Sequence, residues 1–571
     1  MTTQVHLPRF SDPADIDEFV ATLEKFEKGE IGPEQFRAFR LVRGVYGQRQ
    51  PDVQMLRVKI PFGQLGAEQL EALADVADRY SRGFGHVTTR QNLQFHFLQM
   101  ADMEPAMRRL DEAGLTTREA CGNSVRNVTA CATAGVCSGA PFDVTPYAEA
   151  VVRLFLRHPL SGSLPRKFKI AFSGCADDCA MAAINDLGFI ARTRRGERGF
   201  KVVAAGGLST SPQAAVTLHE FLPASEIGRV GETLLRIFHA LGNRENKARA
   251  RLKYVLRKLG EEGFRARYAE VRAEVDAEAV AELHLPYPPV TTPAAPVWDD
   301  AADGHAQGYL PWRSSSVFDQ KDPDYVSVYT RLFLGDVRSV QLRALARIVG
   351  RFGDGTLRLS IDQNLVLPWV DRRSLPALHR ALAAIDLARP FVHTARDVTS
   401  CPGAETCNLA VTASRSLADA ITEQLEQPEL AGLQAMPTTS IKISGCPNSC
   451  GQHHVADIGF HGAAKTVDGT TVPMYQLHLG GGVDEQGARF GRQVVKIVAR
   501  RVPGAVVRLL RLYEEGHAEG ETTAHFFANV DPKRVVSALG ELLGPATSAE
   551  TADIGETIGF HVKTGVGECA A

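Results

Sequence analysis

Eight of the ten cysteines fall into two sets of four with nearly the same spacing. The first quartet has the spacing Cys-x5-Cys-x37-Cys-x3-Cys and consists of Cys131, Cys137, Cys175 and Cys179. The second quartet has the spacing Cys-x5-Cys-x38-Cys-x3-Cys and consists of Cys401, Cys407, Cys446 and Cys450. In a reducing compartment such sets favour metal or iron–sulfur ligation over disulfides. Structural zinc sites mostly use shorter Cys-x2-Cys to Cys-x4-Cys pairs, whereas four thiolates are the usual ligands of a 4Fe-4S cluster. The spacing favours a cluster over zinc, and Cys121 and Cys569 are left without an assigned role.

The quartets belong to a longer internal repeat. Residues 61–98 and 334–370 align with an offset of 272 at Gly63/Gly335 and Gln91/Gln363, and the quartets follow at offsets of 270 and 271. Each copy predicts an alternating strand, an amphipathic helix and a second strand. After the first cysteine pair comes a predicted helix, and then a strand that leads into the second pair. The chain is therefore expected to be an internally duplicated α+β protein.

The repeat also predicts the division of the chain. A Pro- and Ala-rich stretch, typical of an extended linker, separates the two halves. The first half is expected to hold an N-terminal segment with a first half-domain (1–118) and a first cysteine-bearing domain (119–284). After the linker (285–305), the second half is expected to hold a second half-domain (306–390) and a second cysteine-bearing domain (391–571).

Composition limits the class of protein. Hydrophobic residues make up 44% and charged residues 23%, and no apolar run is long enough to span a membrane. The N-terminal residues lack the features of an export signal, so a cytoplasmic protein is expected. A net charge of -2 gives no general attraction to nucleic acid, and any anion site must be local.

The residues around the second quartet carry a family resemblance. "TSCPGAETCNLA" and "SGCPNSCGQHHVADIGF" resemble the sirohaem and 4Fe-4S sulfite and nitrite reductases of the one-chain, assimilatory type. The resemblance implies two ferredoxin-like units and two sirohaem/iron–sulfur-binding units in a pseudo-twofold arrangement. It also implies that the second quartet holds a 4Fe-4S cluster and that Cys450 bridges this cluster to the sirohaem iron.

The same resemblance implies an anion-binding set in the first half, namely Arg90, Arg126, Lys167 and Lys169, of which Arg90 and Arg126 would also contact the sirohaem. Asp362, Thr438 and Ser440 stand at three of the matching positions of the second half. Arg126 falls opposite Val398 or Arg396, and the local motif favours Arg396. Lys167 and Lys169 alternate on a predicted strand and would face one side. One active site is therefore expected between a metal-binding second half and a cationic first half.

The first quartet leaves two interpretations open. It holds a second 4Fe-4S cluster, or it consists of free thiols retained from the duplication. The spacing favours a cluster, whereas Asp177 and Asp178 place acidic side chains beside ligands that must be anionic.

Two residues bear on the substrate in opposite directions. Gln452 is similar to the residue of nitrite reductases, whereas Lys169 is similar to sulfite reductases. A second ammonium group benefits dianionic sulfite more than monoanionic nitrite. Six-electron reduction of sulfite to sulfide, with Lys167 and Lys169 also relaying protons, is therefore the favoured function, and reduction of nitrite to ammonia is the alternative.

Two further classes are weaker. A non-catalytic duplicated zinc scaffold would need the cysteines but not the four cations, and a dissimilatory subunit or partner-binding module would not need both halves in one chain. The glycine-rich residues 477–487 lack the context of a dinucleotide-binding motif. Electrons must therefore come from an external donor, either ferredoxin or a separate flavoprotein.

Overall fold

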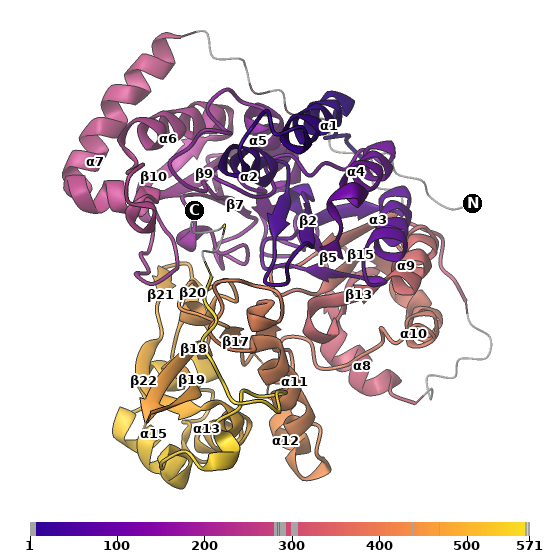
Figure 1. Cartoon of the computed structure of the whole chain (residues 1–571). Helices are drawn as coiled ribbons and strands as arrows, with labels where there is room; N and C mark the ends of the chain where they lie inside the picture. Colours follow the sequence, from indigo (N-terminus) through magenta and orange to yellow (C-terminus); the bar gives the residue numbers. More distant parts are fainter. Residues whose placement is uncertain are drawn as a thin grey trace.

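The computed structural model describes residues 7–278, 283, 285, 293–298, 307–434, 436, 438–467, 469–565 and 568. Helices and sheets form two ferredoxin-like units and two cluster-type units, each of the latter with one cysteine quartet, and the expected boundaries between these units remain a prediction. The ferredoxin-like units lie side by side, with one cluster-type unit at the upper left and the other below in Figure 1. The expected duplicated α+β fold is confirmed. Cys569 and most of the expected linker lie outside the described residues.

The two ferredoxin-like units contain corresponding elements. The first has α1 (Pro13–Glu27), α2 (Pro33–Val42), β1 (Val45–Gly47), β2 (Gln54–Val58), β3 (Gln64–Gly66), α3 (Ala67–Tyr80), β4 (Phe84–Val87), β5 (Leu93–Leu98) and α4 (Met103–Glu112). The second has α8 (Tyr309–Ser316), β11 (Val317–Asp319), β12 (Tyr325–Thr330), β13 (Asp336–Arg338), α9 (Ser339–Phe352), β14 (Thr356–Leu359), β15 (Leu365–Asp371) and α10 (Leu375–Ala383).

The cluster-type units each contain a five-stranded sheet. The first has β6 (Thr129–Ala130), α5 (Thr145–Phe155), β7 (Ile170–Ser173), β8 (Leu187–Arg194), β9 (Glu197–Ala204), β10 (Val216–Pro223), α6 (Ile227–Leu241) and α7 (Leu252–Ala277). The second has β16 (Thr399–Ser400), α11 (Ser414–Leu425), α12 (Ala431–Gln434), β17 (Ile441–Ser444), β18 (Ile458–Val467), β19 (Thr470–Leu479), β20 (Gly482–Asp484), β21 (Gly487–Arg489), β22 (Arg492–Val498), α13 (Val502–Gly516), α14 (Thr523–Asn529) and α15 (Pro532–Leu539). The first three strands of each sheet are parallel and the rest antiparallel, in the orders β6-β7-β8-β9-β10 and β16-β17-β18-β19-β22.

The ferredoxin-like units exchange a strand. The first strand after the repeat's glycine, β3, pairs with β14 of the second unit, and β13 pairs with β4 of the first. Helices α3 and α9 pack against each other, and the apolar side chains of both units form one continuous buried cluster. Because neither sheet is complete without the other unit, the two are expected to unfold together.

Two glutamines of the repeat form hydrogen bonds that join different units of the chain. Nε2 of Gln91 donates to the carbonyl oxygens of Ala130 (2.8 Å) and Leu359 (2.7 Å), and Nε2 of Gln363 donates to that of Val87 (2.9 Å). Both glutamine side chains are buried. A Cβ atom on Gly63, whose φ is +73°, would lie 2.7 Å from the oxygen of Leu359, so glycine is required at this junction. The repeat is thus visible in equivalent tertiary contacts.

Among the described residues, no helix combines the length and the apolar character needed to cross a bilayer.

Candidate active site

The thiols of the second quartet converge in the second cluster-type unit. Burial raises the pKa of the Cys446 thiol, and the other three thiols of the quartet lie near enough to raise it further. The backbone N–H of Gly445 donates to Sγ of Cys401 at 3.2 Å, and Cys450 is the exposed member. Clustered thiols become thiolates readily only when a cation balances their charge, so this donor set fits a metal cluster.

The thiols of the first quartet converge in the same way. Contact with Cys175 raises the pKa of Cys137, and contact with Cys131 raises that of Cys179. The N–H of Gly174 donates to Sγ of Cys131 at 3.1 Å, as the N–H of Gly445 does to Cys401 in the second quartet. The two quartets therefore have equivalent local geometry.

The two aspartates of the first quartet differ in their surroundings. Asp178 is buried, and its carboxylate accepts hydrogen bonds from the N–H groups of Ala182 (2.7 Å) and Ala183 (2.9 Å) at the start of the short helix η3 (Ala182–Ile184). Asp177 is exposed, and its Oδ2 lies 3.7 Å from Sγ of Cys175. Asp178 therefore serves the backbone turn, and only Asp177 lies beside a thiol.

Lys167 and Lys169 flank Phe168 just before β7. The prediction that both lie on the strand was wrong. Phe168 forms only an isolated bridge with Val125, and the ladder begins at Ile170, because the N–H of Lys169 donates to Oδ2 of Asp186 at 2.9 Å. The Phe168 ring is fully buried in the core, so in this extended segment the two lysines point away from that core.

Lys169 lies where the two halves meet. Burial, Arg90 and Arg251 hold its pKa well below the ordinary value, and Cys450 of the second half opposes the shift. The hydroxyl of Thr89, next to Arg90, donates to the carbonyl oxygen of Cys450 at 2.9 Å. The structure thus brings Lys169 and the segment that carries Arg90 close to the last cysteine of the second quartet.

The two predicted arginines donate hydrogen bonds to uncharged oxygen acceptors. Arg90 donates through Nη1 to Oδ1 of Asn185 (2.8 Å) and through Nη2 to the oxygen of Ile170 (2.7 Å), and burial lowers its pKa to about 9. Its Nε is buried without a hydrogen-bond partner within the described residues. Arg126 donates through Nη1 to the oxygen of Ala120 at 2.8 Å. The orphaned Nε of Arg90 fits a site that receives an anionic group.

A buried aspartate and two further cations belong to the same region. Asp186 is fully buried and accepts two hydrogen bonds from Arg251, at 3.1 and 2.7 Å. Lys253 donates to the carbonyl oxygens of Leu208 and Ser211, both at 2.6 Å, and burial lowers its pKa to about 7. Sequence reasoning missed all three residues, because they have no partner motif and lie 17 or more residues from the lysine pair.

We expect Asp186→Asn to destabilise the protein. The change removes the charge that balances Arg251 and weakens the acceptor of the Lys169 N–H, and breaking a buried ion pair costs about 3 kcal/mol. Urea unfolding of the loaded protein should show this loss. Asp177→Asn, at an exposed aspartate, is the control and should leave the midpoint unchanged. Equal midpoints for the two variants would contradict the role of Asp186.

Each ferredoxin-like unit holds the cluster loop of the other half. The N–H of Arg49 donates to the oxygen of Thr406 (2.8 Å), and its Nη2 donates to that of Ala410 (2.7 Å). In the other copy, the N–H of Lys321 donates to the oxygen of Val136 at 2.9 Å. The cysteine loop of one half is therefore positioned by residues of the other half.

The corresponding site of the second half has a different charge pattern. A cavity of about 350 Å³ is lined by Asp362, Thr438 and Ser440, the positions matching Arg90, Lys167 and Lys169. Nζ of the buried Lys442 lies 2.6 Å from Oδ1 of Asp362, a pair that sequence reasoning missed. Asp397 and Asp457 also line this cavity. These carboxylates disfavour a dianion there.

The start of the first strand in each cluster-type sheet shows which residue of the second half is equivalent to Arg126. Strand β6 begins at Thr129 and β16 at Thr399, an offset of 270 that places Arg126 opposite Arg396, as the motif favoured. Arg396 forms an ion pair with Glu426. The fourth cation is therefore present in both copies, with an acidic partner in the second.

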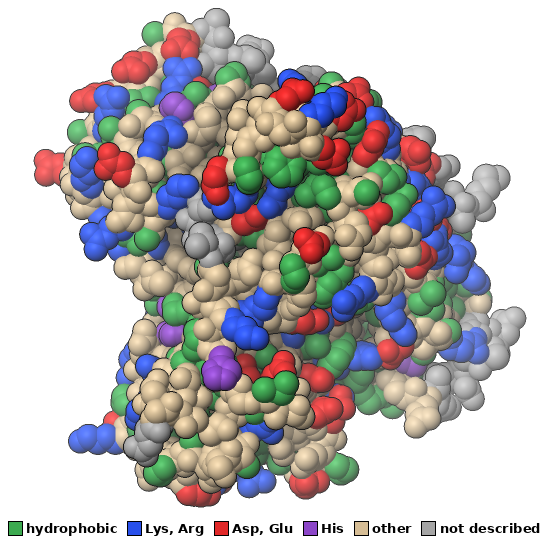
Figure 2. Space-filling view, viewed as in Figure 1, with side chains coloured by type: hydrophobic (Ala, Val, Ile, Leu, Met, Phe, Trp, Pro, Cys, Tyr) green, Lys and Arg blue, Asp and Glu red, His purple; other side chains and the backbone are tan. Residues whose placement is uncertain are grey.

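The face of the molecule seen in Figure 2 carries charges of both signs. In Figure 2, Lys and Arg side chains are interspersed with Asp and Glu over the visible face. With a net charge of -2, the cations around Lys169 are a local feature, as the composition predicted.

Comparison with known families agrees with the duplication. The nitrite and sulphite reductase 4Fe-4S domain matches residues 121–276 and 392–544, and the nitrite/sulfite reductase ferredoxin-like half domain matches 46–113 and 318–385. These matches cover more than half of the chain, so the chain belongs to the nitrite and sulphite reductase family. It is an oxidoreductase with sirohaem and 4Fe-4S cofactors.

Individual relatives cover most of the chain. A sulfite reductase [ferredoxin] of Mycolicibacterium paratuberculosis is 29% identical over 84% of this chain and 83% of its own. A ferredoxin–nitrite reductase of Synechococcus elongatus is 30% identical over 80% of this chain and 85% of its own. The structure of Mycobacterium tuberculosis NirA protein covers 91% of this chain and 97% of its own, with a TM-score of 0.76 and 26% identity. The relatives include both sulfite and nitrite enzymes.

Proposed function

We propose that this chain reduces sulfite to sulfide in a six-electron reaction at one site between its halves. The observation that carries the proposal is the position of Lys169, which lies among first-half cations at the contact that Thr89 makes with Cys450 of the second half. The second quartet would hold the 4Fe-4S cluster, with Cys450 as the bridge to sirohaem. When bound, these cofactors supply one-electron transfers, which the side chains cannot perform.

The cations would bind the substrate and position its oxygens. Arg90, Arg126, Lys167 and Lys169 bring four positive groups to a dianion, and Arg90 and Arg126 would also contact the carboxylates of the macrocycle. Asp186 keeps Lys169 and Arg251 in place. These groups need no reorganisation when negative charge develops on the substrate.

Lys169 would also supply protons. Burial and neighbouring cations lower its pKa well below the ordinary value, so its ammonium group gives up a proton more readily than a solvated lysine. A general acid works best when its pKa lies near the working pH. Lys169 and Lys167 can therefore donate protons as substrate oxygens leave.

Nitrite reduction to ammonia is the second candidate, because Gln452 is similar to the residue of nitrite reductases and several relatives are nitrite reductases. The structure weakens the argument from Gln452. Its Oε1 lies 3.3 Å from Nζ of Lys442, which belongs to the second-half cavity. Gln452 thus contacts a second-half lysine, whereas Lys169 lies among the first-half cations.

The electron donor is an external protein. The names of the sulfite reductase and nitrite reductase relatives include ferredoxin, which favours a ferredoxin as the donor over a separate flavoprotein. Turnover with reduced ferredoxin and no added flavoprotein would support ferredoxin as the donor.

Steady-state kinetics with both substrates tests the proposed function. We expect the purified, coloured holoenzyme to show a higher kcat/KM for sulfite than for nitrite with the same reduced donor. A higher kcat/KM for nitrite would replace the proposal by the nitrite alternative. A colourless, zinc-loaded and inactive protein would support the scaffold alternative.

The first quartet is tested by the double change Cys175→Ser, Cys179→Ser. We expect lower iron and acid-labile sulfide per chain and lower stability, because the convergent thiols favour a second cluster over free thiols. The KM for sulfite should change little, because the cavity beside this quartet presents carboxylates and hydroxyls. Unchanged iron would identify free thiols. Loss of all activity in folded protein would mean that this quartet belongs to the working half or carries electrons.

A further inference from the structure

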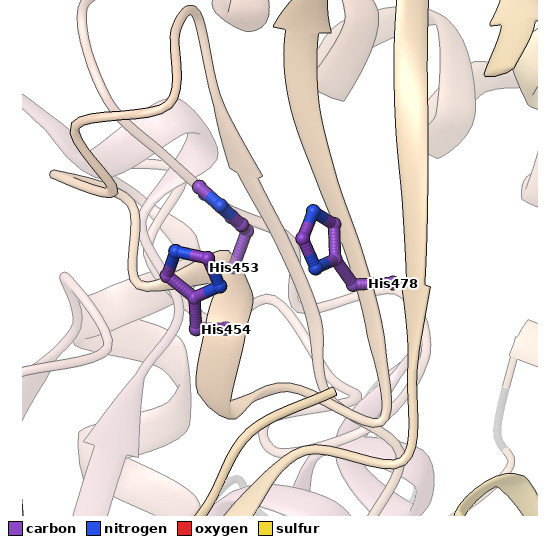
Figure 3. Close-up of side chains that lie close together, drawn as sticks. All are labelled: His453, His454 and His478. Atoms are coloured by element: carbon purple, nitrogen blue, oxygen red, sulfur yellow. The ribbon is translucent and has the colours of Figure 1, made fainter. Parts of the chain in front are cut away.

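Three buried histidines and one partly buried histidine lie together in the second cluster-type unit. His453 and His454 belong to the short helix η10 (His453–Val455), His461 to β18 and His478 to β19. Ring nitrogens of His453, His454 and His478 all lie within 4.8 Å of one another, and these three side chains are 5% exposed or less. Figure 3 shows the three rings gathered between η10 and the strand. The family resemblance gives no role to these rings.

The backbone is shaped to bring these rings together. A Cβ on Gly459 would lie 2.0 Å from the carbonyl oxygen of His453, and a Cβ on Gly481 would lie 2.3 Å from that of His454. Two glycines therefore allow η10 to approach the sheet closely. On the sheet, His461 and His478 are diagonal neighbours across the β18–β19 ladder, since His478 pairs with Gly459 and His461 with Gln476.

The hydrogen bonds leave ring nitrogens available. Neither nitrogen of His453 has a hydrogen-bond partner in the described part of the chain, although its side chain is fully buried. Nε2 of His454 lies 3.0 Å from the carbonyl oxygen of Ser209. Because a carbonyl oxygen only accepts, this Nε2 carries the proton and Nδ1 of His454 keeps its lone pair.

The ring of His461 can act as a hydrogen-bond acceptor behind His478. Nε2 of His478 lies 2.8 Å from Nδ1 of His461. When this Nε2 donates to His461, Nδ1 of His478 keeps its lone pair. Histidine ligands of metals commonly donate their second N–H to a carbonyl or another acceptor, as His454 and His478 do in this arrangement.

Burial favours the neutral form of these rings. Burial and the three neighbouring imidazoles hold the pKa of His453 well below the ordinary value, and burial lowers that of His478 to about 3. Neutral imidazole is the form that binds metal. A neutral ring with two buried, unpartnered nitrogens is otherwise unfavourable in a core.

We propose that His453, His454 and His478 bind one zinc ion, at a site separate from both cysteine quartets. Three imidazoles with an open fourth position are an established zinc ligand set. Two nitrogens on a tetrahedral zinc ion lie about 3.4 Å apart, so small ring rotations would complete the site. A bound ion would fasten η10, which begins three residues after Cys450, to β19.

Zinc content and X-ray absorption of the holoenzyme test this site. After exposure to Zn²⁺ and removal of loosely bound ions, we expect about one zinc per chain, with nitrogen neighbours at about 2.0 Å and imidazole scattering. Sulfur neighbours at about 2.3 Å would place the zinc on a cysteine quartet and overturn the proposal. A wild-type protein that retains no zinc would overturn it as well.

Matched variants provide a second test. His478→Gln and His453→Gln should each lower zinc occupancy at least tenfold at a fixed free Zn²⁺ concentration, while iron content stays near that of the wild type. His525→Gln is the control, because His525 is exposed on α14 and pairs with Glu521. If either histidine variant fails to fold, the X-ray absorption spectrum of the wild-type protein still identifies the zinc ligands. Zinc occupancy equal to the control in both folded variants would contradict the assignment.

Discussion

Replacing Cys450 by serine is expected to abolish sulfite reduction. Cys450 is the exposed member of the second quartet, it lies near Lys169, and the hydroxyl of Thr89 in the first half donates to its carbonyl oxygen. A serine hydroxyl does not replace a thiolate ligand shared between two cofactors. We expect protein that lacks normal coupling between cluster and sirohaem, measured by iron and sirohaem content, by the visible spectrum and by turnover.

The duplication supplies a matched control for this change. Cys179→Ser alters the equivalent position of the first quartet, which is also exposed. It should keep most of the sulfite turnover. Full activity in Cys450→Ser would place the reaction at the first quartet, and loss of activity in folded Cys179→Ser would mean that the first quartet belongs to the working half or carries electrons.

Lys169→Asn is expected to lower sulfite turnover about tenfold or more and to reduce nitrite turnover less. The change removes one of the positive groups that would face the substrate, and a tenfold effect corresponds to about 1.4 kcal/mol of transition-state stabilisation. Sulfite carries two charges and loses more from this change than nitrite, which carries one. Measuring kcat and KM for both substrates in the same preparation checks the difference.

Ser440→Asn is the control for Lys169→Asn, because Ser440 occupies the same repeat position in the second half. Oγ of Ser440 lies 2.8 Å from Oδ2 of Asp457, in the cavity that lacks the cation set. This variant should leave sulfite kinetics close to those of the wild type. Equal losses on sulfite and nitrite in Lys169→Asn would remove Lys169 as a discriminator between the two substrates.

Several features followed from the sequence because they depend on short segments. The Cys-x5-Cys and Cys-x3-Cys pairs lie on compact loops, so their spacing alone indicated which thiols would meet. Comparing the copies then showed that Arg90, Lys167 and Lys169 are replaced by Asp362, Thr438 and Ser440. A repeat turns residue identity into a prediction of position, because equivalent residues occupy equivalent places in equivalent units.

The sequence predicted the exact bounds of strands less well. Lys167 and Lys169 alternate with apolar residues, which predicted a strand, but the ladder begins only at Ile170. The N–H of Lys169 binds the carboxylate of Asp186 instead of a neighbouring strand. Alternation records which side of an extended segment is buried, and it does not specify the hydrogen-bond partner of each N–H.

The sequence by itself determined the duplication, the two thiol sets and the loss of three cations in one copy. Only the tertiary structure decided that the ferredoxin-like units exchange β3 and β13, that each unit holds the cluster loop of the other half, and that Asp186 fixes Lys169 and Arg251. The physical reason is separation along the chain. Contacts such as Thr89 with Cys450, 361 residues apart, follow from the packing of complete units, and no local pattern records them.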